Sequence, residues 1–409
     1  MSFNKSKLAL AVAAAAGLTF SSGAFATNGI IQAGNGMVAH GMGGAGLSNA
    51  GEAAAGMDNP ALISQTGDAL GIGYSFFMPD RSRRTPAGSF PVVEERSDAH
   101  AFAIPQLAYT SAINNTLSGG LMVYAAGGMN TDYGTTGSSV DLSMLFVAPT
   151  LSYAFTKDVS VGASLLVVYE NFRARGVFDM TGAPGSPPTG YTDESTATGY
   201  GVKLGVNAKV ANGISVGAVL QPKLSMGEID SFKTYVDSVA NYVTGGAVRY
   251  TGDAALTLPN LAGVGAKFAV GKDVDINADL MYYQWTSVDL FKFFGWEDQT
   301  VLKVGAEWRT SDKLALRAGF NYGKSPISAN KSIIGASGFT AVSANGIFPA
   351  VSEMHVTVGL GYKMDKNMAF NAYYLYSPEN KVEDAAALGG AMAKMSQHAL
   401  GLGINYAAK

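Results

Sequence analysis

Residues 354–363 read Met-His-Val-Thr-Val-Gly-Leu-Gly-Tyr-Lys, and apolar side chains alternate along this stretch with small or polar ones. The same alternation runs through residues 202–209, 314–322 and 400–406. Because successive side chains of a β-strand point to opposite faces of the sheet, each stretch has one apolar face and one small or polar face. The pattern predicts strands. It does not separate a soluble β-sandwich from a membrane β-barrel, because both have strands with one apolar face.

The spacing of the connections favours the barrel. Short polar turns alternate without exception with longer loops, and the strands between them run to about ten or more residues, which is typical of outer-membrane barrels. The short turns lie at 114–115, 156–158, 211–213, 271–273, 311–313 and 365–367, and the long loops at about 80–97, 127–139, 179–198, 227–252, 289–298, 324–350 and 379–395. We therefore predict an all-β fold, a 14-stranded antiparallel transmembrane β-barrel over residues 67–409 that crosses the outer membrane of a Gram-negative bacterium many times.

The composition excludes several other classes of protein. Only 14% of the 409 residues are charged, whereas soluble domains average about 25%. The net charge of −3 offers no basic surface to nucleic acid. Four His and no Cys leave little for a zinc or thiol site. We predict no metal and no cofactor.

An outer-membrane lipid hydrolase is a distant alternative. A Ser nucleophile needs a base within hydrogen-bond reach, but His355 and His398 fall on different predicted strands with no obvious Ser–acid arrangement. The glycines of residues 41–46 have the spacing of a dinucleotide-binding loop, but no buried strand precedes them. We therefore predict no catalytic residues and a protein that is not an enzyme.

The first 66 residues do not share the strand pattern. Lys5 and Lys7 precede an apolar run that ends before Ala24-Phe25-Ala26, so residues 1–26 are predicted to be a signal peptide rather than a membrane anchor. Residues 27–66 are rich in glycine and form either a periplasmic tail or a hatch folded inside the barrel. We favour the hatch, because a lumen of this size is too wide for side chains of the wall to fill.

Aromatic side chains crowd one predicted outer loop, and large apolar side chains exposed at the membrane exterior mark a binding surface. Basic residues nearby suit the head of an amphipathic carboxylate. The alternatives are packing between loops for the aromatic residues, and lipopolysaccharide contact or a solvated rim for the basic ones. The candidate ligand-binding residues are Phe291, Lys292, Phe293, Phe294 and Trp296 in the loop, with Arg173 and Arg175 at the end of a long strand.

In their order along the chain, four motifs make the sequence resemble the FadL family of outer-membrane long-chain fatty acid and hydrocarbon transporters. They are Asn59-Pro60-Ala61 after the glycine-rich segment, 256–260 (Leu-Thr-Leu-Pro-Asn), 282–285 (Tyr-Tyr-Gln-Trp) and 316–327, which ends in Ser-Pro-Ile. The resemblance covers nearly the whole chain after residue 26. The chain departs from the family at its end, where Ala407-Ala408-Lys409 follows Tyr406, and in its short, Pro-rich loop 179–198.

This resemblance implies a fourteen-stranded barrel with an N-terminal hatch, a low-affinity groove between outer loops, a deeper hydrophobic pocket with basic residues near the ligand head, and a kinked third strand that opens the wall sideways. The hatch residues would be Asn59, Pro60 and Ala61. The third strand spans about 116–128, and the expected kink glycines are Gly119, Gly120, Gly127 and Gly128.

The function expected from these features is passive uptake of long-chain fatty acids or similar hydrophobic compounds through the pocket and a movement of the hatch. An aromatic hydrocarbon channel of the same family is the near alternative, and a structural barrel with a filled lumen is a distant one. The expected partners are the hydrophobic small molecule and the lipids of the outer membrane, with the protein as a monomer.

Overall fold

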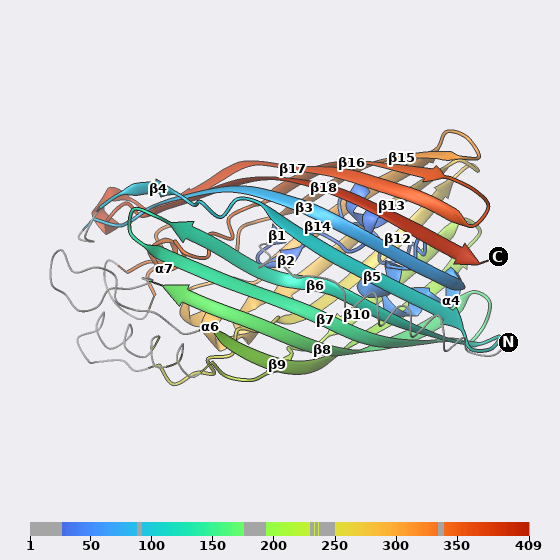
Figure 1. Ribbon diagram of the computed structural model, residues 1–409, viewed down its shortest axis with the longest axis horizontal. Helices are drawn as coiled ribbons and strands as arrows, with labels where there is room; N and C mark the ends of the chain where they lie inside the picture. Colours follow the sequence, from blue (N-terminus) through green and yellow to red (C-terminus); the bar gives the residue numbers. More distant parts are fainter. Residues whose placement is uncertain are drawn as a thin grey trace.

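Antiparallel strands form a closed, tilted wall in the computed structural model (Figure 1). The structure describes residues 27–87, 92–175, 194–229, 233, 236, 250–333 and 339–408; the predicted signal peptide and most of loop 179–198 lie outside them. The fourteen strands of the wall are β3 (Asp68–Arg84), β5 (Phe102–Ala112), β6 (Leu117–Tyr133), β7 (Ser138–Ala154), β8 (Val159–Arg175), β9 (Ser195–Ala211), β10 (Ile214–Gln221), β12 (Asn260–Val270), β13 (Val274–Gln284), β14 (Gln299–Arg309), β15 (Leu314–Gly323), β16 (Met354–Lys363), β17 (Met368–Glu383) and β18 (Met392–Ala408). The last strand pairs with the first from Ala408↔Asp68 to Met392↔Arg84, which closes the barrel.

The predicted fold class is therefore confirmed, but several loop boundaries are wrong. The stretch taken as loop 127–139 is mostly strand, because β6 continues to Tyr133 and β7 begins at Ser138. Likewise β3 and β17 continue beyond residues 80 and 379. These strands extend beyond the apolar belt. Their backbones stay paired there although their side chains are polar, so the change to polar residues did not mark the ends of the strands.

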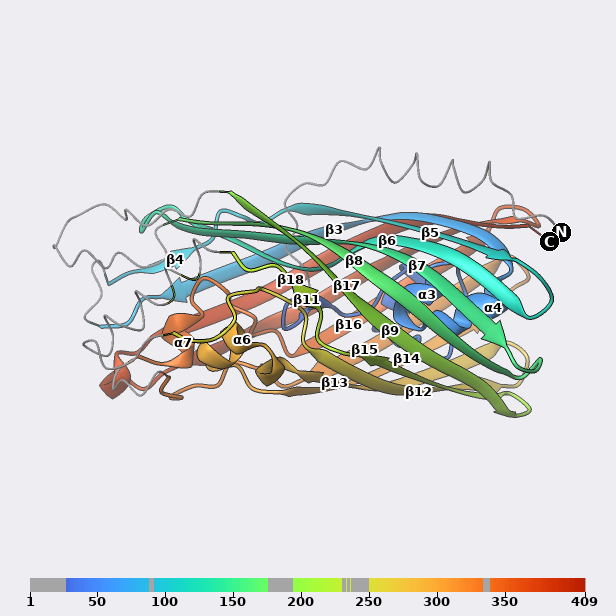
Figure 2. The ribbon, with the colours of Figure 1, turned by 90° about the horizontal axis from the view of Figure 1, so that it is seen from below.

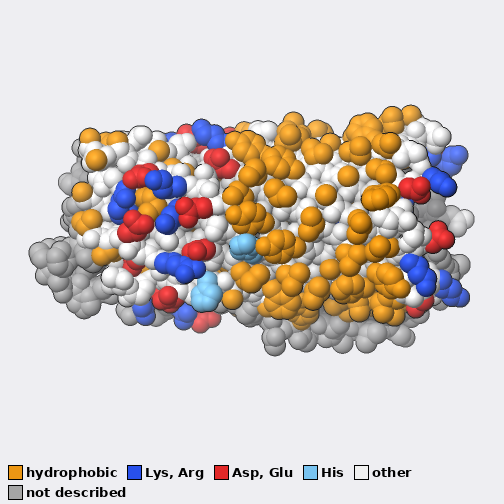
Figure 3. Space-filling view, turned by 90° about the horizontal axis from the view of Figure 1, so that it is seen from above, with side chains coloured by type: hydrophobic (Ala, Val, Ile, Leu, Met, Phe, Trp, Pro, Cys, Tyr) orange, Lys and Arg blue, Asp and Glu red, His pale blue; other side chains and the backbone are white. Residues whose placement is uncertain are grey.

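The apolar side chains of the alternating pattern face outward. On β18, Leu400, Leu402 and Ile404 are exposed on the outside of the wall. Figure 3 shows such side chains as a broad belt, with charged side chains gathered beyond both of its edges. An outward apolar band of this kind belongs in the hydrocarbon layer of a membrane. No helix among the described residues is both long and apolar enough to span a bilayer.

Residues 27–66 fold inside the barrel (Figures 1 and 2). We call this segment the hatch. Its elements are β1 (Thr27–Asn28), β2 (Ile31–Gln32), α2 (Met37–Gly41), α3 (Ala55–Asp58), η1 (Pro60–Leu62) and α4 (Ile63–Thr66). Most of its side chains are buried against the inner face of the wall, so it is a plug rather than a tail.

Glycines on the inner face of the wall make room for the hatch. A Cβ atom at Gly319 of β15 would lie 2.0 Å from the backbone carbon of Met42, and one at Gly162 of β8 would lie 2.3 Å from that of Pro60. Contacts this short do not occur, so larger residues at these positions would displace the hatch backbone. The small residues of the alternating pattern therefore form the surface on which the hatch is seated.

The long connections gather at the end of the barrel opposite the end of β18 at Ala408 (Figure 2), and we call this the outer end. They contain β4 (Glu94–Arg96), β11 (Ser225–Met226), η2 (Trp285–Ser287), α6 (Asp289–Phe293), α7 (Ala341–Ala344) and η3 (Ala386–Leu388). In Figure 2, α6 and α7 lie side by side there, and Asn345, just after α7, donates a hydrogen bond to the Phe294 carbonyl just after α6.

We predict that Gly319→Val destabilises the protein and loosens the hatch, because overpacking a filled interior costs about 1–3 kcal/mol. Ala318→Val is the matched control, since Ala318 is exposed on the outer face of the same strand. Thermal unfolding and proteolysis of the hatch measure the effect. Equal unfolding temperatures and equal proteolysis rates of the two variants would contradict the conclusion that the hatch packs against the inner glycines.

Candidate functional site

Asn59 fixes the corner between the hatch and the wall. Its side chain is fully buried, and its amide nitrogen donates to the carbonyls of Leu47 at 2.7 Å and Val206 at 3.0 Å. Its Oδ1 accepts the N–H of Ala61 at 3.0 Å, which caps the η1 helix, and Pro60 occupies the first helical position. One side chain therefore joins two parts of the hatch to strand β9.

The carbonyl of Ala61 is a second anchor. It accepts hydrogen bonds from the hydroxyls of Ser152 on β7 and Ser160 on β8, both at 3.0 Å. The Asn59-Pro60-Ala61 motif is thus held by strands β7, β8 and β9 together. The sequence placed this motif at a junction, but it gave no sign of which strands would hold it.

Charged and polar side chains of the wall hold the middle of the hatch. The Asp279 carboxylate accepts the backbone N–H groups of Gly46 at 2.7 Å and Leu47 at 3.1 Å. Lys203 donates to the Met57 carbonyl at 2.7 Å, and the Thr357 hydroxyl accepts the N–H of Gly43 at 2.8 Å. Residues 43–61 are consequently tied to the wall at many points.

The N-terminal part of the hatch is held differently, by the edge of β6. Ile31 pairs with Gly127, and the Gly128 N–H donates to the Ile30 carbonyl at 3.3 Å. The Gln32 side chain donates to the Ala125 carbonyl. These residues complete backbone pairing that the neighbouring wall strand does not supply.

The third wall strand, β6, is irregular at this point. Its ladder with β5 ends at Gln106↔Tyr124, and the next residue of β5 is Pro105, which has no N–H to donate. On its other side, the register with β7 shifts between Ala125 and Gly127.

Of the four glycines expected to form a kink, Gly127 and Gly128 lie at this irregularity. Gly119 and Gly120 do not, because both pair in register with β5 and β7. The irregularity of the ladder therefore involves one of the two glycine pairs, and the kink itself stays a prediction.

A cavity of about 50 Å³ lies between the hatch and the wall. Its lining is mixed: apolar side chains and polar or charged side chains both contribute. The apolar ones are Ile31, Leu47, Phe146, Leu258, Leu261 and Met281, and the polar or charged ones include Gln32, Gln221, Asp58, Lys203 and Lys303. Asp58 accepts two hydrogen bonds from Asn35, and Lys203 is bonded to the hatch. Lys303 is buried and lies opposite Asp279 in the β13–β14 ladder, but no hydrogen bond or ion pair with another described residue engages its ammonium group.

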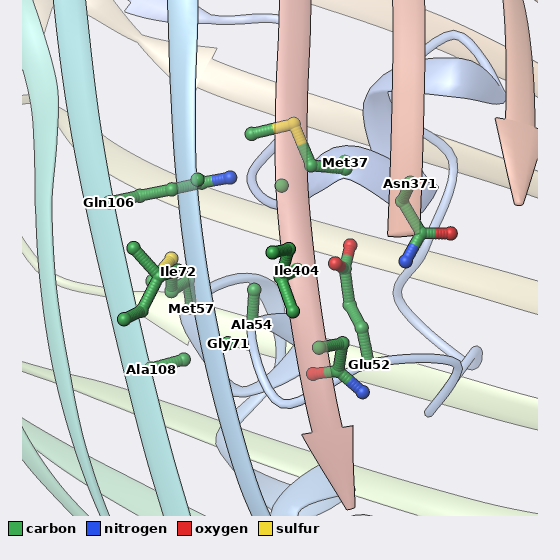
Figure 4. Close-up of a pocket in the computed structure, with 13 residues that line it drawn as sticks. Met37, Glu52, Ala54, Met57, Gly71, Ile72, Gln106, Ala108, Asn371 and Ile404 are labelled. Atoms are coloured by element: carbon green, nitrogen blue, oxygen red, sulfur yellow. The ribbon is translucent and has the colours of Figure 1, made fainter. Parts of the chain in front are cut away.

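A second gap lies beside α2 and has a volume of only about 10 Å³. Figure 4 shows Met37, Glu52 and Met57 of the hatch beside Gln106 and Asn371 of the wall. A space of this size holds at most one water, so it is not a ligand pocket.

The Glu52 carboxylate beside this gap accepts the Val38 N–H at 2.7 Å. Burial raises the pKa of this carboxyl to about 7, and this effect outweighs the opposing hydrogen bond from Val38 and the charge of Arg317. The closed hatch therefore contains a carboxyl group that titrates near neutral pH.

A groove of about 610 Å³ opens between the outer loops. Tyr250, Phe293 and Ile333 supply its apolar surface, Lys292 and Lys331 supply positive charge, and Asp289 supplies negative charge. Lys331 is paired with Glu297 at 3.3 Å. Two of the residues predicted from the sequence, Lys292 and Phe293, therefore line the same groove.

The other predicted aromatic residues form a core between the loops. Phe291, Phe294 and Trp296 are buried, and the Phe291 and Trp296 rings lie 4.5 Å apart. The Trp296 indole donates to Asn345 at 2.6 Å, which joins the two outer loops. These three residues therefore pack between the loops, which was the alternative to a ligand-binding role. The sequence did not show that their surroundings differ from those of Phe293.

Arg173 and Arg175 face away from the lumen. Their neighbours Phe172 and Ala174 are buried, whereas Arg173 is exposed on the outer face together with Tyr169. Arg175 donates to the Gly137 carbonyl at 3.0 Å. The structure does not bring these arginines to the cavity or the groove, because the outward register of Tyr169 continues to the end of β8.

The His residues take part in local contacts. His355 lies 2.7 Å from the Gln397 amide nitrogen, and His398 lies 2.6 Å from the Tyr374 hydroxyl. His40 and His100 contact the backbone carbonyls of Gly36 and Asp98. Within the described ranges, no group of three or more His, Asp or Glu side chains is arranged to hold a metal ion.

A barrel with a lipid-facing wall, an internal hatch, an inner cavity and an outer groove defines a passage for small molecules through the outer membrane. The chain belongs to the family described as outer membrane protein transport protein (OMPP1/FadL/TodX), whose sequence model matches residues 12–409. It is therefore an outer-membrane transporter of hydrophobic compounds and not an enzyme.

Solved structures are similar in fold over nearly their whole length. A Pseudomonas aeruginosa FadL homologue has 14% identity and a TM-score of 0.66, with 93% of this chain and 99% of that chain covered. The P. putida toluene transporter TodX has 18% identity and a TM-score of 0.66, with 92% and 99% covered. The CymD monoaromatic hydrocarbon channel has 15% identity and a TM-score of 0.62, with 94% and 99% covered. A comparison with curated proteins gave no match.

We predict that Asn59→Ala loosens the hatch by about 1–3 kcal/mol, because the carbonyls of Leu47 and Val206 lose a buried donor. Hydrogen exchange of residues 43–61 should become faster, while the unfolding temperature of the barrel stays close to that of the unmodified protein. Exchange rates that match the unmodified protein would show that Asn59 does not hold the hatch.

The raised pKa of Glu52 predicts that the stability of the closed hatch depends on pH. Its pKa of about 7 in the closed hatch lies above the ordinary 4.5, so the stability it contributes is complete below about pH 4.5 and is lost as the pH rises through 7. After correction for intrinsic rates, the Val38 amide should exchange faster at pH 8 than at pH 6. Glu52→Gln should abolish this difference, and its persistence in that variant would count against the assignment.

Proposed function

We propose that the protein takes up long-chain fatty acids or similar apolar carboxylates by diffusion across the outer membrane. The observation that carries this proposal is Lys303, a buried residue at a partly apolar cavity whose ammonium group makes no hydrogen bond or ion pair with the described residues. A buried ammonium group that makes no hydrogen bond is costly, even with the Asp279 and Asp58 carboxylates in its neighbourhood. The carboxylate of an amphipathic ligand would provide the hydrogen-bond acceptor, while the apolar part of the lining would contact its tail.

The outer groove is suited to capture the same kind of molecule. Phe293 and Tyr250 offer an apolar surface, and Lys292 and Lys331 lie at the same groove. A fatty acid has both complementary parts. The groove is open to the exterior side, so it would hold the ligand before the ligand reaches the lumen.

The small cavity requires part of the hatch to move. Its volume of about 50 Å³ is well below the roughly 150 Å³ of a cavity that binds benzene. Ile31, Gln32 and Asn35 form one side of it. Residues 27–36 are held mainly at the edge of β6, whereas residues 43–61 are tied to several strands.

We therefore assign the movement to residues 27–36. A ligand that binds the enlarged cavity more tightly than the closed one would shift the population toward the enlarged state. The corner at Asn59 would stay in place as the pivot.

Uptake of aromatic hydrocarbons is the alternative, and the observation that favours it is the group of apolar side chains on the cavity wall, among them Phe146, Leu258 and Met281. A hydrocarbon would fill the same space, but it would give the Lys303 ammonium group no hydrogen-bond acceptor. The two functions therefore differ in what they require of this one side chain.

The test is uptake of labelled oleate and of toluene by cells that carry the protein with Lys303, Lys303→Met or Lys303→Arg. Removing one charge-assisted hydrogen bond, about 1.5–3 kcal/mol, should reduce oleate uptake by about tenfold or more in Lys303→Met. Lys303→Arg keeps the charge and should retain most of the uptake. Toluene uptake should be unchanged. Oleate uptake equal in cells with and without the protein would refute the proposal, and toluene uptake alone would support the alternative.

A further inference from the structure

Arg81 lies on the inner face of β3 near the outer end of this strand. At this point β3 no longer pairs with β5, because that ladder ends at Phe77↔Phe102. The Arg81 carbonyl accepts the Ser97 N–H at 2.8 Å, and β5 starts only at Phe102. The Arg81 side chain reaches from β3 to β6, where its Nη1 donates a hydrogen bond to the Asn130 carbonyl. It therefore lies at the irregular edge of β6, nearer the outer end than the cavity around Lys303.

The guanidinium group of Arg81 is only partly satisfied. The residue is 1% exposed, and its Nε and Nη2 atoms have no hydrogen-bond partner among the described residues. The ion pairs found in the described part of the chain do not include it. Its neighbours are aromatic and apolar side chains: the Phe102 ring centroid lies 5.8 Å from Cζ in a cation–π contact, Tyr133 is nearby, and the cross-strand neighbour is the buried Met395.

Arg83, two residues along on the same strand, provides an internal comparison. It is also buried, but its Nε and Nη2 atoms donate to the Glu95 carboxylate at 3.0 and 2.9 Å. The two atoms that bind a carboxylate in Arg83, Nε and Nη2, are thus the two that have no hydrogen-bond partner among the described residues in Arg81. Arginine presents these two donors in a fixed geometry that fits a carboxylate.

We propose that Arg81 binds the carboxylate head of the ligand between the outer groove and the inner cavity, and that it is a specificity-determining residue of the transporter. This inference rests on the proposed function, because it assumes that the substrate is an amphipathic carboxylate. Both atoms are shielded in this structure, so the head would accept hydrogen bonds from Nε and Nη2 once neighbouring side chains move aside, while Nη1 keeps its bond to Asn130. The apolar tail would lie against Phe102 and its neighbours, so an uncharged analogue would make the tail contacts without the head contact.

The experiment compares oleate with oleyl alcohol, which has the same chain and no charge. Full-length protein with Arg81→Met should take up oleate about tenfold more slowly, the effect of one lost charge-assisted contact, and oleyl alcohol at the unmodified rate. Arg81→Lys keeps the charge and should retain part of the selectivity. Arg96→Met is the matched control, because Arg96 lies on β4 beside β3 and is exposed, and it should change neither rate.

Equal slowing of both probes by Arg81→Met would show a purely structural role and would overturn the inference. Unchanged oleate uptake in that variant would overturn it as well, while leaving the proposed function intact. If the unmodified protein takes up oleyl alcohol but not oleate, the proposed function fails first and the inference fails with it. Normal unfolding temperatures of all variants exclude loss of folding as the cause.

Discussion

Backbone groups inside a membrane must be paired within the protein, because lipid offers them no partner, and the rest of this structure follows from that requirement. The wall meets it by closing β18 onto β3 along their whole length. At the edge of β6 the ladder with β5 stops beside Pro105, and here the hatch and Arg81 supply the missing partners. The same contacts that complete the wall also close the lumen, which makes this edge the place where pairing and passage are linked.

The strand period sets both surfaces of the wall at once. Outward positions are large and apolar for lipid, whereas inward positions are small where the hatch approaches and polar where it is bound. Gly319 and Gly162 admit the hatch backbone, and Asp279 and Lys203 bind it. A shift by one residue would exchange the two faces, so the register of each strand is fixed by lipid outside and by the hatch inside. Lys303 belongs to the inner set, but its ammonium group makes no hydrogen bond or ion pair among the described residues, which distinguishes it from the residues that hold the hatch.

Much of the fold was predictable from the sequence, and the site only in part. Period-two alternation and turn spacing depend on local residues, so they revealed the strands, their number and the outward apolar face. The outward register of Tyr169 also contained the information that Arg173 and Arg175 would face away from the lumen. Lys303 could have been noticed as a charge on an inward position, since charges inside a membrane protein are a sign of function. The partners of Asn59, the different surroundings of Phe293 and Phe294, and the unpaired edge of Arg81 depend on segments far apart in the chain, and no local pattern reports them.

The most direct measurement is a crystal structure of the protein with bound oleate. The account predicts that the oleate carboxylate lies within hydrogen-bond distance of Lys303, with its chain along the apolar lining and residues 27–36 displaced from the edge of β6. An oleate molecule bound with its chain toward Lys303 and its head elsewhere, or a ligand-filled lumen with the whole hatch moved as one piece from β7, β8 and β9, would contradict it.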